Sequence, residues 1–326
     1  MKTPIVPVID VHLLPEETHR ALANDVRKGL SAKPKDLPPK WFYDAQGSAL
    51  FDKITRLPEY YPTEAERSIL AEQADAIADL SDADTLVELG PGSADKTRVL
   101  LDALRLRGSL ERYVPFDVSE SALMSASKMI ASQYPGLTVH GVVGDFDRHL
   151  DMIPSGGTRM IAFLGGTIGN YEPAARKRFF ELLSKQMHSY DTLLLGVDLV
   201  KDPARLVQAY DDESGVTAAF NKNVLAVINR ALGASFDLDK FEHVALWDPV
   251  NEWIEMRLRS IVKQRVTVRD VGLTVEFAKG EEMRTEISAK FRREGICREL
   301  VSAGFDLLAW FPDAAADYAL ILSRKP

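Results

Sequence analysis

Short apolar runs alternate with amphipathic stretches between about residue 63 and residue 200 of this chain. Five runs have strand length, and several end directly on Gly or Asp: 85–89, 113–116, 138–142, 159–164 and 192–197. Thr63, followed three residues later by Glu66, predicts the capping-box start of a helix. Strands separated by helices predict a doubly wound α/β core with a parallel sheet. Ligands of such sheets bind at the carboxyl ends of the strands.

The alternation of strands and helices stops after Asp198. Two helical stretches follow, at 203–210 and 216–232. After them come alternating segments typical of antiparallel strands, at 253–258, 266–268, 274–277 and 285–291. The last two predicted strands are 307–311 and 318–322. The proline-rich first sixty residues predict short helices joined by turns. We therefore expect a core of residues 63–200 and 289–326. Residues 1–62 and 201–288 are expected to form a second, α+β lobe.

Composition narrows the class of protein. Hydrophobic residues make up 46% and charged residues 27%, which is typical of an ordinary globular protein, and no apolar run has the length of a membrane span. The N-terminus lacks the apolar stretch of a signal peptide, and the single Cys297 cannot form an internal disulfide. A net charge of −8 argues against a nucleic-acid partner. We expect a cytoplasmic monomer that binds neither nucleic acid nor a membrane.

Candidate ligand groups follow the first three predicted strands. Gly90 and Gly92 allow a tight turn and a close approach of a ligand to the backbone before a helix begins. Asp117 ends the second strand, where a carboxylate can accept both ribose hydroxyls of an adenosine. Asp145 and Phe146 follow the third strand and suit an adenine amino group and the face of the base. The alternative for each is a turn or helix-cap residue without a ligand.

The loop after the fourth strand contains Gly165 and Asn170. The order of the groups after the first three strands suits S-adenosylmethionine better than NAD, because Asp95 stands where a dinucleotide site has its third glycine. Methyl transfer from a sulfonium is an in-line displacement, so the protein mainly has to bring a lone pair to the methyl group in the right orientation. A backbone carbonyl at a glycine and a side-chain amide suit that task. The Asn/Asp-Pro-Pro-aromatic signature of nucleic-acid amino-methyltransferases is missing here, which favours a small substrate.

Several longer segments carry a resemblance that extends over nearly the whole chain. They include Pro-Pro-Lys-Trp-Phe-Tyr-Asp at 38–44, Thr-Arg-Leu-Pro-Glu-Tyr-Tyr-Pro-Thr at 55–63, Gly-Asp-Phe at 144–146 and Gly-Glu-Glu-Met-Arg-Thr-Glu-Ile-Ser at 280–288. These segments resemble the L-histidine Nα-methyltransferases of ergothioneine biosynthesis. The resemblance implies a class I, Rossmann-like methyltransferase core with a substrate lobe, S-adenosylmethionine as methyl donor, and trimethylation of the α-amine of L-histidine to hercynine.

Two loops depart from the family's usual pattern. The family commonly has Gly-Ser-Gly where this chain has Gly-Pro-Gly at 90–92, and Gly-Ser-Thr where it has Gly-Gly-Thr at 165–167. Both changes are small and local, so they bear on the fine geometry of the cofactor site and leave the reaction unchanged.

Strand alternation gives two substrate candidates independently of the resemblance. In residues 285–291, Glu286 and Ser288 share one face, where the carboxylate can accept an imidazole N–H and the hydroxyl can pair with the other ring edge. A solvent-facing strand is the alternative, and the resemblance favours the pocket. Met256 is either an apolar wall beside the ring or a core methionine.

The resemblance assigns the remaining roles. It implies that Asn170 and Tyr210 hold the α-carboxylate, that Tyr60 contacts the imidazole, and that Tyr43 lies near the amine. Tyr43, Phe51 and Phe220 offer aromatic faces, which attract a quaternary ammonium product. The predicted catalytic residues are Tyr43, Gly165 and Asn170, and the predicted cofactor residues are Gly90, Gly92, Lys96, Asp117, Asp145 and Phe146.

Three questions of chemistry remain at this point. Each attacking amine must be neutral, and since no histidine lies in a recognisable base motif, we expect its proton to leave to water, directly or through Tyr43. The six histidines show no metal-ligand spacing, so we expect no metal. The alternatives are methylation of another free amino acid such as an aromatic one, a non-catalytic adenosine-binding scaffold, and an NAD-dependent oxidoreductase. The last is disfavoured because Asp95 stands where a dinucleotide site has its third glycine.

Overall fold

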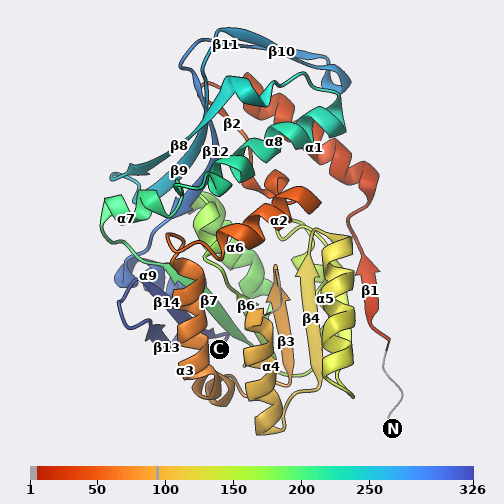
Figure 1. The fold of residues 1–326 in the computed structure, drawn as a ribbon. Helices are drawn as coiled ribbons and strands as arrows, with labels where there is room; N and C mark the ends of the chain where they lie inside the picture. Colours follow the sequence, from red (N-terminus) through yellow and green to blue (C-terminus); the bar gives the residue numbers. More distant parts are fainter. Residues whose placement is uncertain (1–5, 93–94) are drawn as a thin grey trace. The chain divides into compact units, whose positions relative to one another are not determined.

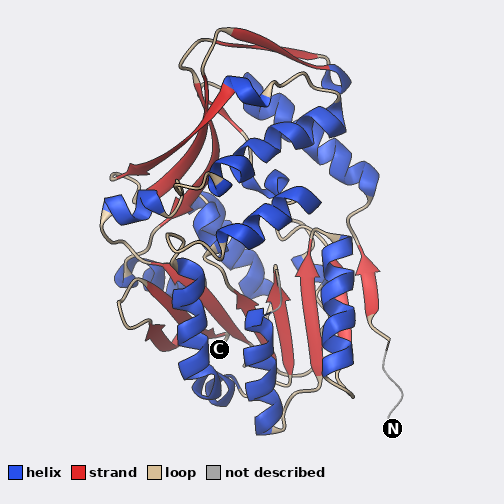
Figure 2. Cartoon of the chain, viewed as in Figure 1, coloured by secondary structure: helices blue, strands red, loops and turns tan. Residues whose placement is uncertain are grey.

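The computed structural model describes residues 6–92 and 95–326 (Figures 1 and 2). The chain divides into two compact units built from interleaved segments. Unit 1 contains the segment up to Leu13, Pro62–Val200 and Lys290–Pro326, and unit 2 contains Leu14–Tyr61 and Lys201–Ala289. Loop positions 93 and 94 lie outside the described residues, as do residues 1–5. The expectation that no signal peptide is present was drawn from residues 1–10 and so falls partly outside the described residues.

Unit 1 is built on a sheet that has eight strands within the described part of the chain. In spatial order they are β1 (Val8–Val11), β5 (Thr138–Val143), β4 (Arg112–Asp117), β3 (Thr85–Leu89), β6 (Arg159–Phe163), β7 (Thr192–Asp198), β14 (Tyr318–Arg324) and β13 (Asp306–Pro312). β14 runs antiparallel to both neighbours, and the strands from β1 to β7 pair in parallel. The predicted doubly wound, Rossmann-like α/β core is confirmed.

Helices cover this sheet. They are α3 (Pro62–Ser81), α4 (Asp95–Arg107), α5 (Glu120–Gln133), α6 (Pro173–Gln186) and α9 (Arg293–Ser302). Every residue of β3, β6 and β7 is buried, which is typical of parallel strands covered on both faces. Figure 1 shows α3, α4 and α5 over the same face, and their apolar side chains join one buried cluster.

Two features of unit 1 differ from the sequence-based expectation. Residues 1–62 were expected in the substrate lobe, but Val8–Val11 pairs with 140–143 and extends the core sheet at its edge. The helix expected to start after Thr63 begins at Pro62, because proline suits the first helical position, where no N–H is needed. Glu66 is therefore not a capping-box acid. It points into the interior of unit 1, where it binds three other elements.

Unit 2 combines a small sheet with helices. Its strands β2 (Lys35–Asp36), β12 (Glu282–Ala289), β9 (Trp253–Ser260) and β8 (Phe241–Asp248) pair in that order, and β10 (Gln264–Val268) pairs with β11 (Leu273–Phe277). The helical segments include α1 (Pro15–Ser31), η1 (Pro39–Phe42), α2 (Ala45–Ile54), α7 (Pro203–Gln208) and α8 (Val216–Leu232). Buried side chains of α1, α8 and the strands form the core of unit 2.

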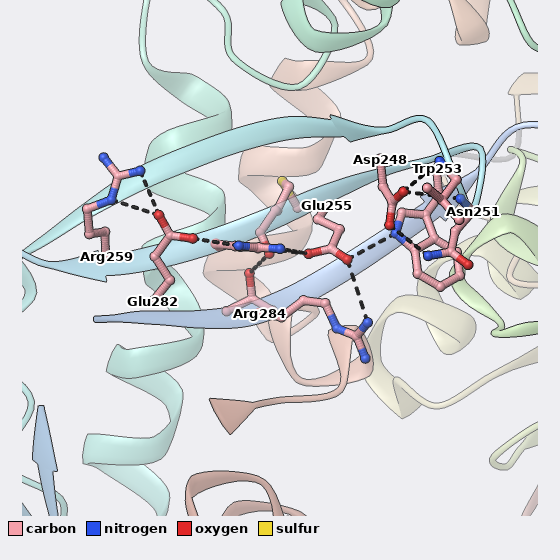
Figure 3. Close-up of polar contacts among 11 residues, drawn as sticks. Asp248, Asn251, Trp253, Glu255, Arg259, Glu282 and Arg284 are labelled. Carbon is pink, nitrogen blue, oxygen red and sulfur yellow. Dashed lines mark hydrogen bonds and ion pairs between the residues drawn. The ribbon is translucent and has the colours of Figure 1, made fainter. Parts of the chain in front are cut away.

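One face of the unit 2 sheet is held by ion pairs (Figure 3). Glu282 of β12 accepts hydrogen bonds from Arg259 of β9 at 2.8 and 2.6 Å, and Glu255 accepts from the indole of Trp253 at 3.0 Å. Successive residues of a strand point to opposite faces. Met256, the neighbour of Glu255, accordingly belongs to the apolar core of unit 2. The pairing of β12 with β9 shifts between Arg284 and Glu286, so Glu286 and Ser288 pair with Met256 and Ile254. Glu286 and Ser288 therefore lie on the face of the sheet opposite to the ion pairs.

Candidate active site

The loop between β3 and α4 leaves space for a ligand against its backbone. Gly90 and Gly92 have φ angles of 73° and 53°, a left-handed conformation that glycine adopts at little cost. Among the described residues, a Cβ atom placed on Gly92 would meet no atom within 4 Å, and one on Gly90 would meet only the ring of Phe146 at 3.7 Å. The glycine turn and the aromatic ring after β5 thus lie side by side.

A buried carboxyl group links the strand before this loop to the helix after it. Glu88, at the end of β3, accepts hydrogen bonds from the Thr97 hydroxyl at 2.5 Å and the Tyr113 hydroxyl at 2.9 Å. These contacts join β3 to the first turn of α4 and to β4. Burial raises the pKa of Glu88 to about 7, against the pull of the two hydrogen bonds.

The two aspartates after β4 and β5 are both oriented by backbone amides. Asp117 accepts from the N–H of Ser119 at 2.8 Å, and burial raises the pKa of its carboxyl. Asp145 accepts from the N–H of Asp147 at 2.9 Å. Each aspartate thus makes the contact of a turn residue, but a carboxylate has about four acceptor sites, so this contact does not exclude a ligand. All six predicted cofactor residues belong to unit 1.

The loop after β6 is held by side chains on both sides of one peptide group. The N–H of Gly165 donates to Glu66 at 2.8 and 3.1 Å, and the carbonyl of Leu164 accepts from the Thr167 hydroxyl at 3.1 Å. Gly165 and Gly166 then have φ angles of 77° and 68° and turn the chain into the short helix η3 (Thr167–Asn170). Gly165 and Asn170 are therefore placed by one rigid turn of unit 1.

The predicted aromatic residues of unit 2 form a continuous cluster. The ring of Tyr43 lies 5.6 Å from Phe51 and 5.5 Å from Phe220, measured between ring centroids. Phe51 lies 6.2 Å from Tyr60, which lies 6.1 Å from Tyr210. These contacts are edge-to-face, so the positive edge of one ring meets the negative face of the next. Five residues that are far apart in the sequence are thus brought together.

A polar end continues this cluster. The hydroxyl of Tyr210 lies 2.7 Å from that of Ser288 on β12. Glu286 is 8% exposed and Ser288 is 5% exposed, so these residues do not form a solvent-facing strand. Met256 of β9 pairs directly with Glu286, which places the thioether and the carboxylate on neighbouring strands. Met256 is itself buried in the core of unit 2, so both of its predicted roles remain compatible with its position.

Three further residues support this region and were not identified from the sequence. Thr285 lies at an irregularity in the pairing of β12 and donates to the Asn221 side chain at 2.6 Å. The Asn221 amide donates to Nδ1 of His243 at 2.8 Å, so Nε2 carries the proton and donates to the Tyr210 carbonyl at 2.8 Å. Burial lowers the pKa of His243. The imidazole is thus neutral and occupied at both nitrogens, and it positions Tyr210 instead of acting as a base.

The candidate residues are divided between the units. Gly165 and Asn170 belong to unit 1 with the cofactor residues, whereas Tyr43 and the other predicted substrate residues belong to unit 2. Within the described ranges, no cluster of His, Cys, Asp and Glu side chains has the arrangement of a metal site. Among the same residues, no helix is long and apolar enough to span a bilayer.

Comparisons with known proteins give a consistent set of relatives. A family model described as "Histidine-specific methyltransferase, SAM-dependent" matches residues 22–325. The chain is 55% identical over 314 residues to a histidine N-alpha-methyltransferase of Mycobacterium tuberculosis, covering 96% of this chain and 98% of the relative. It is 54% identical to the protein of that name from Mycolicibacterium smegmatis, with the same coverage. It is 31% identical to ergothioneine biosynthesis protein 1 of Schizosaccharomyces pombe, over 90% of this chain and 40% of the relative.

Two solved structures are also similar. A duf574 family protein from Streptomyces avermitilis has a TM-score of 0.48 and 12% sequence identity, covering 85% of this chain and 90% of the other. An S-adenosylmethionine-dependent methyltransferase from Clostridium acetobutylicum has a TM-score of 0.43 and 12% identity, covering 78% of this chain and 91% of the other.

Proposed function

Because this chain belongs to the histidine-specific, SAM-dependent methyltransferase family, we propose that it methylates the α-amino group of L-histidine with S-adenosylmethionine. Three transfers to one amine give hercynine, the trimethylated product from which ergothioneine is made. The observation that carries the proposal is the unit 2 cluster, where Tyr210 and Ser288 join an aromatic wall to the strand that bears a buried carboxylate, Glu286.

The cofactor residues fit S-adenosylmethionine in chemistry and in order along the sheet. S-adenosylmethionine supplies a methyl group on a positively charged sulfur, which an amine attacks in line. Asp145 and Phe146 after β5 suit the adenine, and Asp117 after β4 suits the ribose hydroxyls. The open turn at Gly92 leaves room for a ligand against the backbone after β3.

In unit 2 we assign recognition of the imidazole to Glu286 and Ser288. The carboxylate accepts a ring N–H, and the Ser288 hydroxyl, oriented by Tyr210, pairs with the other edge. A hydrogen bond to a charged group contributes about 1.5–3 kcal/mol. The phenylalanine side chain has no N–H donor for this carboxylate, whereas imidazole has one, so the pair favours histidine over phenylalanine. We also assign Tyr60 to the ring and Tyr210 to the α-carboxylate, and Asn170 of unit 1 keeps the role that the resemblance implies.

Proton removal is assigned to water, directly or through the Tyr43 hydroxyl. His243, whose imidazole donates to the Tyr210 carbonyl, already uses both of its nitrogens. The rings of Tyr43, Phe51 and Phe220 suit the ammonium product, because aromatic faces attract a quaternary cation. That the enzyme is monomeric and cytoplasmic remains a prediction from its composition.

The direct test is incubation with S-adenosylmethionine and each of histidine, phenylalanine, tyrosine and tryptophan, followed by mass spectrometry. We expect trimethylated histidine and little methylation of the others. An aromatic amino acid as the preferred substrate would support the rival assignment, and no methylated amino acid would end the proposal.

Glu286→Gln tests the specificity residue. It should lower kcat/KM for histidine by about tenfold or more, the cost of a lost charge-assisted contact, and leave S-adenosylhomocysteine affinity unchanged. Glu282→Gln is the matched control, because Glu282 lies on the same strand but pairs with Arg259 on the ion-paired face. Equal effects of the two substitutions would remove Glu286 from the site.

A further inference from the structure

A carboxylate of unit 1 that the reaction scheme leaves unused lies among the candidate active-site residues. Glu66, on α3, is 0% exposed and binds three different elements. One oxygen accepts from the Gly165 N–H after β6 and from the Tyr318 hydroxyl on β14, at 2.8 Å each. The other accepts from Gly165 at 3.1 Å and pairs with the ammonium of Lys96 on α4. A fully buried charge is retained at high cost unless it is paired in this way.

The space around Glu66 is shaped for this carboxylate. A Cβ atom on Gly196 of β7 would lie 2.3 Å from the nearer Glu66 oxygen and 2.5 Å from the Tyr318 hydroxyl. Only a residue without a side chain fits there. With Thr167 holding the Leu164 carbonyl, Glu66 fixes the peptide between Leu164 and Gly165 on both sides. Because the Gly165 N–H is committed to Glu66, the carbonyl is the backbone group of Gly165 that remains to face a ligand.

Lys96 is held at the same point. The Lys96 side chain is 25% exposed whereas the Glu66 side chain is fully buried, so the lysine is the member of the pair that solvent can reach. A Cβ atom on Gly165 would lie 3.8 Å from the Lys96 nitrogen. An ammonium has three donors, so Lys96 can bind Glu66 and an anionic ligand group at the same time. Glu66 thus places a positive charge where the loops after β3 and β6 meet.

The order of strands indicates which part of the cofactor would meet that charge. The sheet runs β5, β4, β3, β6, with adenine assigned to the end of β5 and ribose to the end of β4. The next position along this edge, between β3 and β6, is left for the amino-acid end of S-adenosylmethionine. We propose that Glu66 is a positioning residue that sets Lys96 for the carboxylate of this amino-acid end and sets Gly165 for the reacting amine. This inference rests on the proposed function.

The experiment compares two ligands in wild-type protein and Glu66→Gln. S-adenosylhomocysteine has the amino-acid end, and 5′-methylthioadenosine lacks it. Glutamine keeps the size of Glu66 but offers one acceptor oxygen to three donors, so at least one contact is lost. Calorimetry should show about tenfold weaker binding of S-adenosylhomocysteine, the cost of losing a contact to a charged group, and methylthioadenosine affinity within about twofold. With saturating S-adenosylmethionine, kcat should fall more than KM for histidine changes.

A second comparison tests whether Glu66 acts through Lys96. The double variant Glu66→Gln/Lys96→Gln should bind S-adenosylhomocysteine no more weakly than Lys96→Gln alone. Glu299→Gln, which removes the carboxylate partner of Arg176 elsewhere in unit 1, is the matched control and should leave both ligand affinities unchanged. If Glu66→Gln does not fold, Tyr318→Phe is the substitute, because it removes one hydrogen-bond donor to Glu66. It should also weaken S-adenosylhomocysteine binding and spare methylthioadenosine binding, with a smaller fold-change than Glu66→Gln.

Several results would overturn the inference. Equal weakening of both ligands would mean that Glu66 only supports the fold. Tighter binding of S-adenosylhomocysteine would mean that the freed charge of Lys96 outweighs its lost orientation. If wild-type protein binds neither adenosine ligand, the proposed function fails and the inference falls with it. If wild-type protein binds both ligands and methylates histidine while Glu66→Gln shows no selective loss, the inference alone fails.

Discussion

Replacement of Glu88 by glutamine should stabilise unit 1 at alkaline pH and have a smaller effect at acidic pH. Burial raises the pKa of Glu88 from 4.5 to about 7 in the folded protein. Between these two values the folded state keeps a proton that the unfolded state has released, so stability falls as pH rises through this window. Each pH unit costs about 1.4 kcal/mol, and the whole window costs about 3 kcal/mol. Glutamine is neutral at every pH, so the free energy of unfolding of the variant does not fall in this window.

Hydrogen exchange of the β3 and β4 amides measures this effect, because it reports the opening of unit 1 separately from unit 2. The quantity to follow is the difference in opening free energy between Glu88→Gln and wild-type protein at pH 5, 6, 7 and 8, without ligand. A constant difference in packing cancels, and we expect the variant to gain about 2.5 kcal/mol relative to wild type between pH 5 and pH 8. A difference that stays constant within about 0.5 kcal/mol would refute the assignment of a raised pKa to Glu88.

Two other substitutions test particular contacts. Ser288→Ala and Tyr210→Phe each remove the same hydroxyl pair, so their losses in kcat/KM for histidine should be non-additive by about 0.5–1.5 kcal/mol in a double-mutant cycle, and full additivity would separate the two residues. Asp191→Ala leaves the buried guanidinium of Arg159 without its ion pair and should cost about 3–5 kcal/mol in urea unfolding. A loss under about 1 kcal/mol would mean that water reaches Arg159.

The central sheet was predictable because its strands are buried on both faces and read as continuous apolar runs. The predicted run at 85–89 coincides with β3, and that at 159–164 exceeds β6 by one residue. β8 was missed because it is an edge strand whose half-buried residues include polar ones, among them His243. β1 was missed because four residues carry too little pattern, and only their pairing with β5 shows where they belong.

Some residues of the candidate site could be predicted from the sequence and others could not. Asp117 and Asp145 were identifiable because parallel strands present their carboxyl ends at one edge, a rule that needs no tertiary structure. Asn221, His243 and Thr285 were missed because they meet only through folding, although a buried asparagine on the apolar face of α8 was a usable signal. The sequence around Glu66 is compatible with a helix-capping acid and with a buried ion pair, so its role becomes clear only from its contacts in the structure.

The contact between Glu66 and Tyr318 joins residues separated by 252 positions. Tyr318 lies on β14, which is inserted between β7 and β13 in the sheet. During synthesis on the ribosome, α3 and the strands up to β7 emerge long before β14 does. A nascent chain therefore exposes the edge of β7 and lacks one hydroxyl partner of Glu66 until β14 has been synthesised. A product truncated before β14 would carry every strand end that we propose for adenosine binding and still lack the Tyr318 contact that holds Glu66.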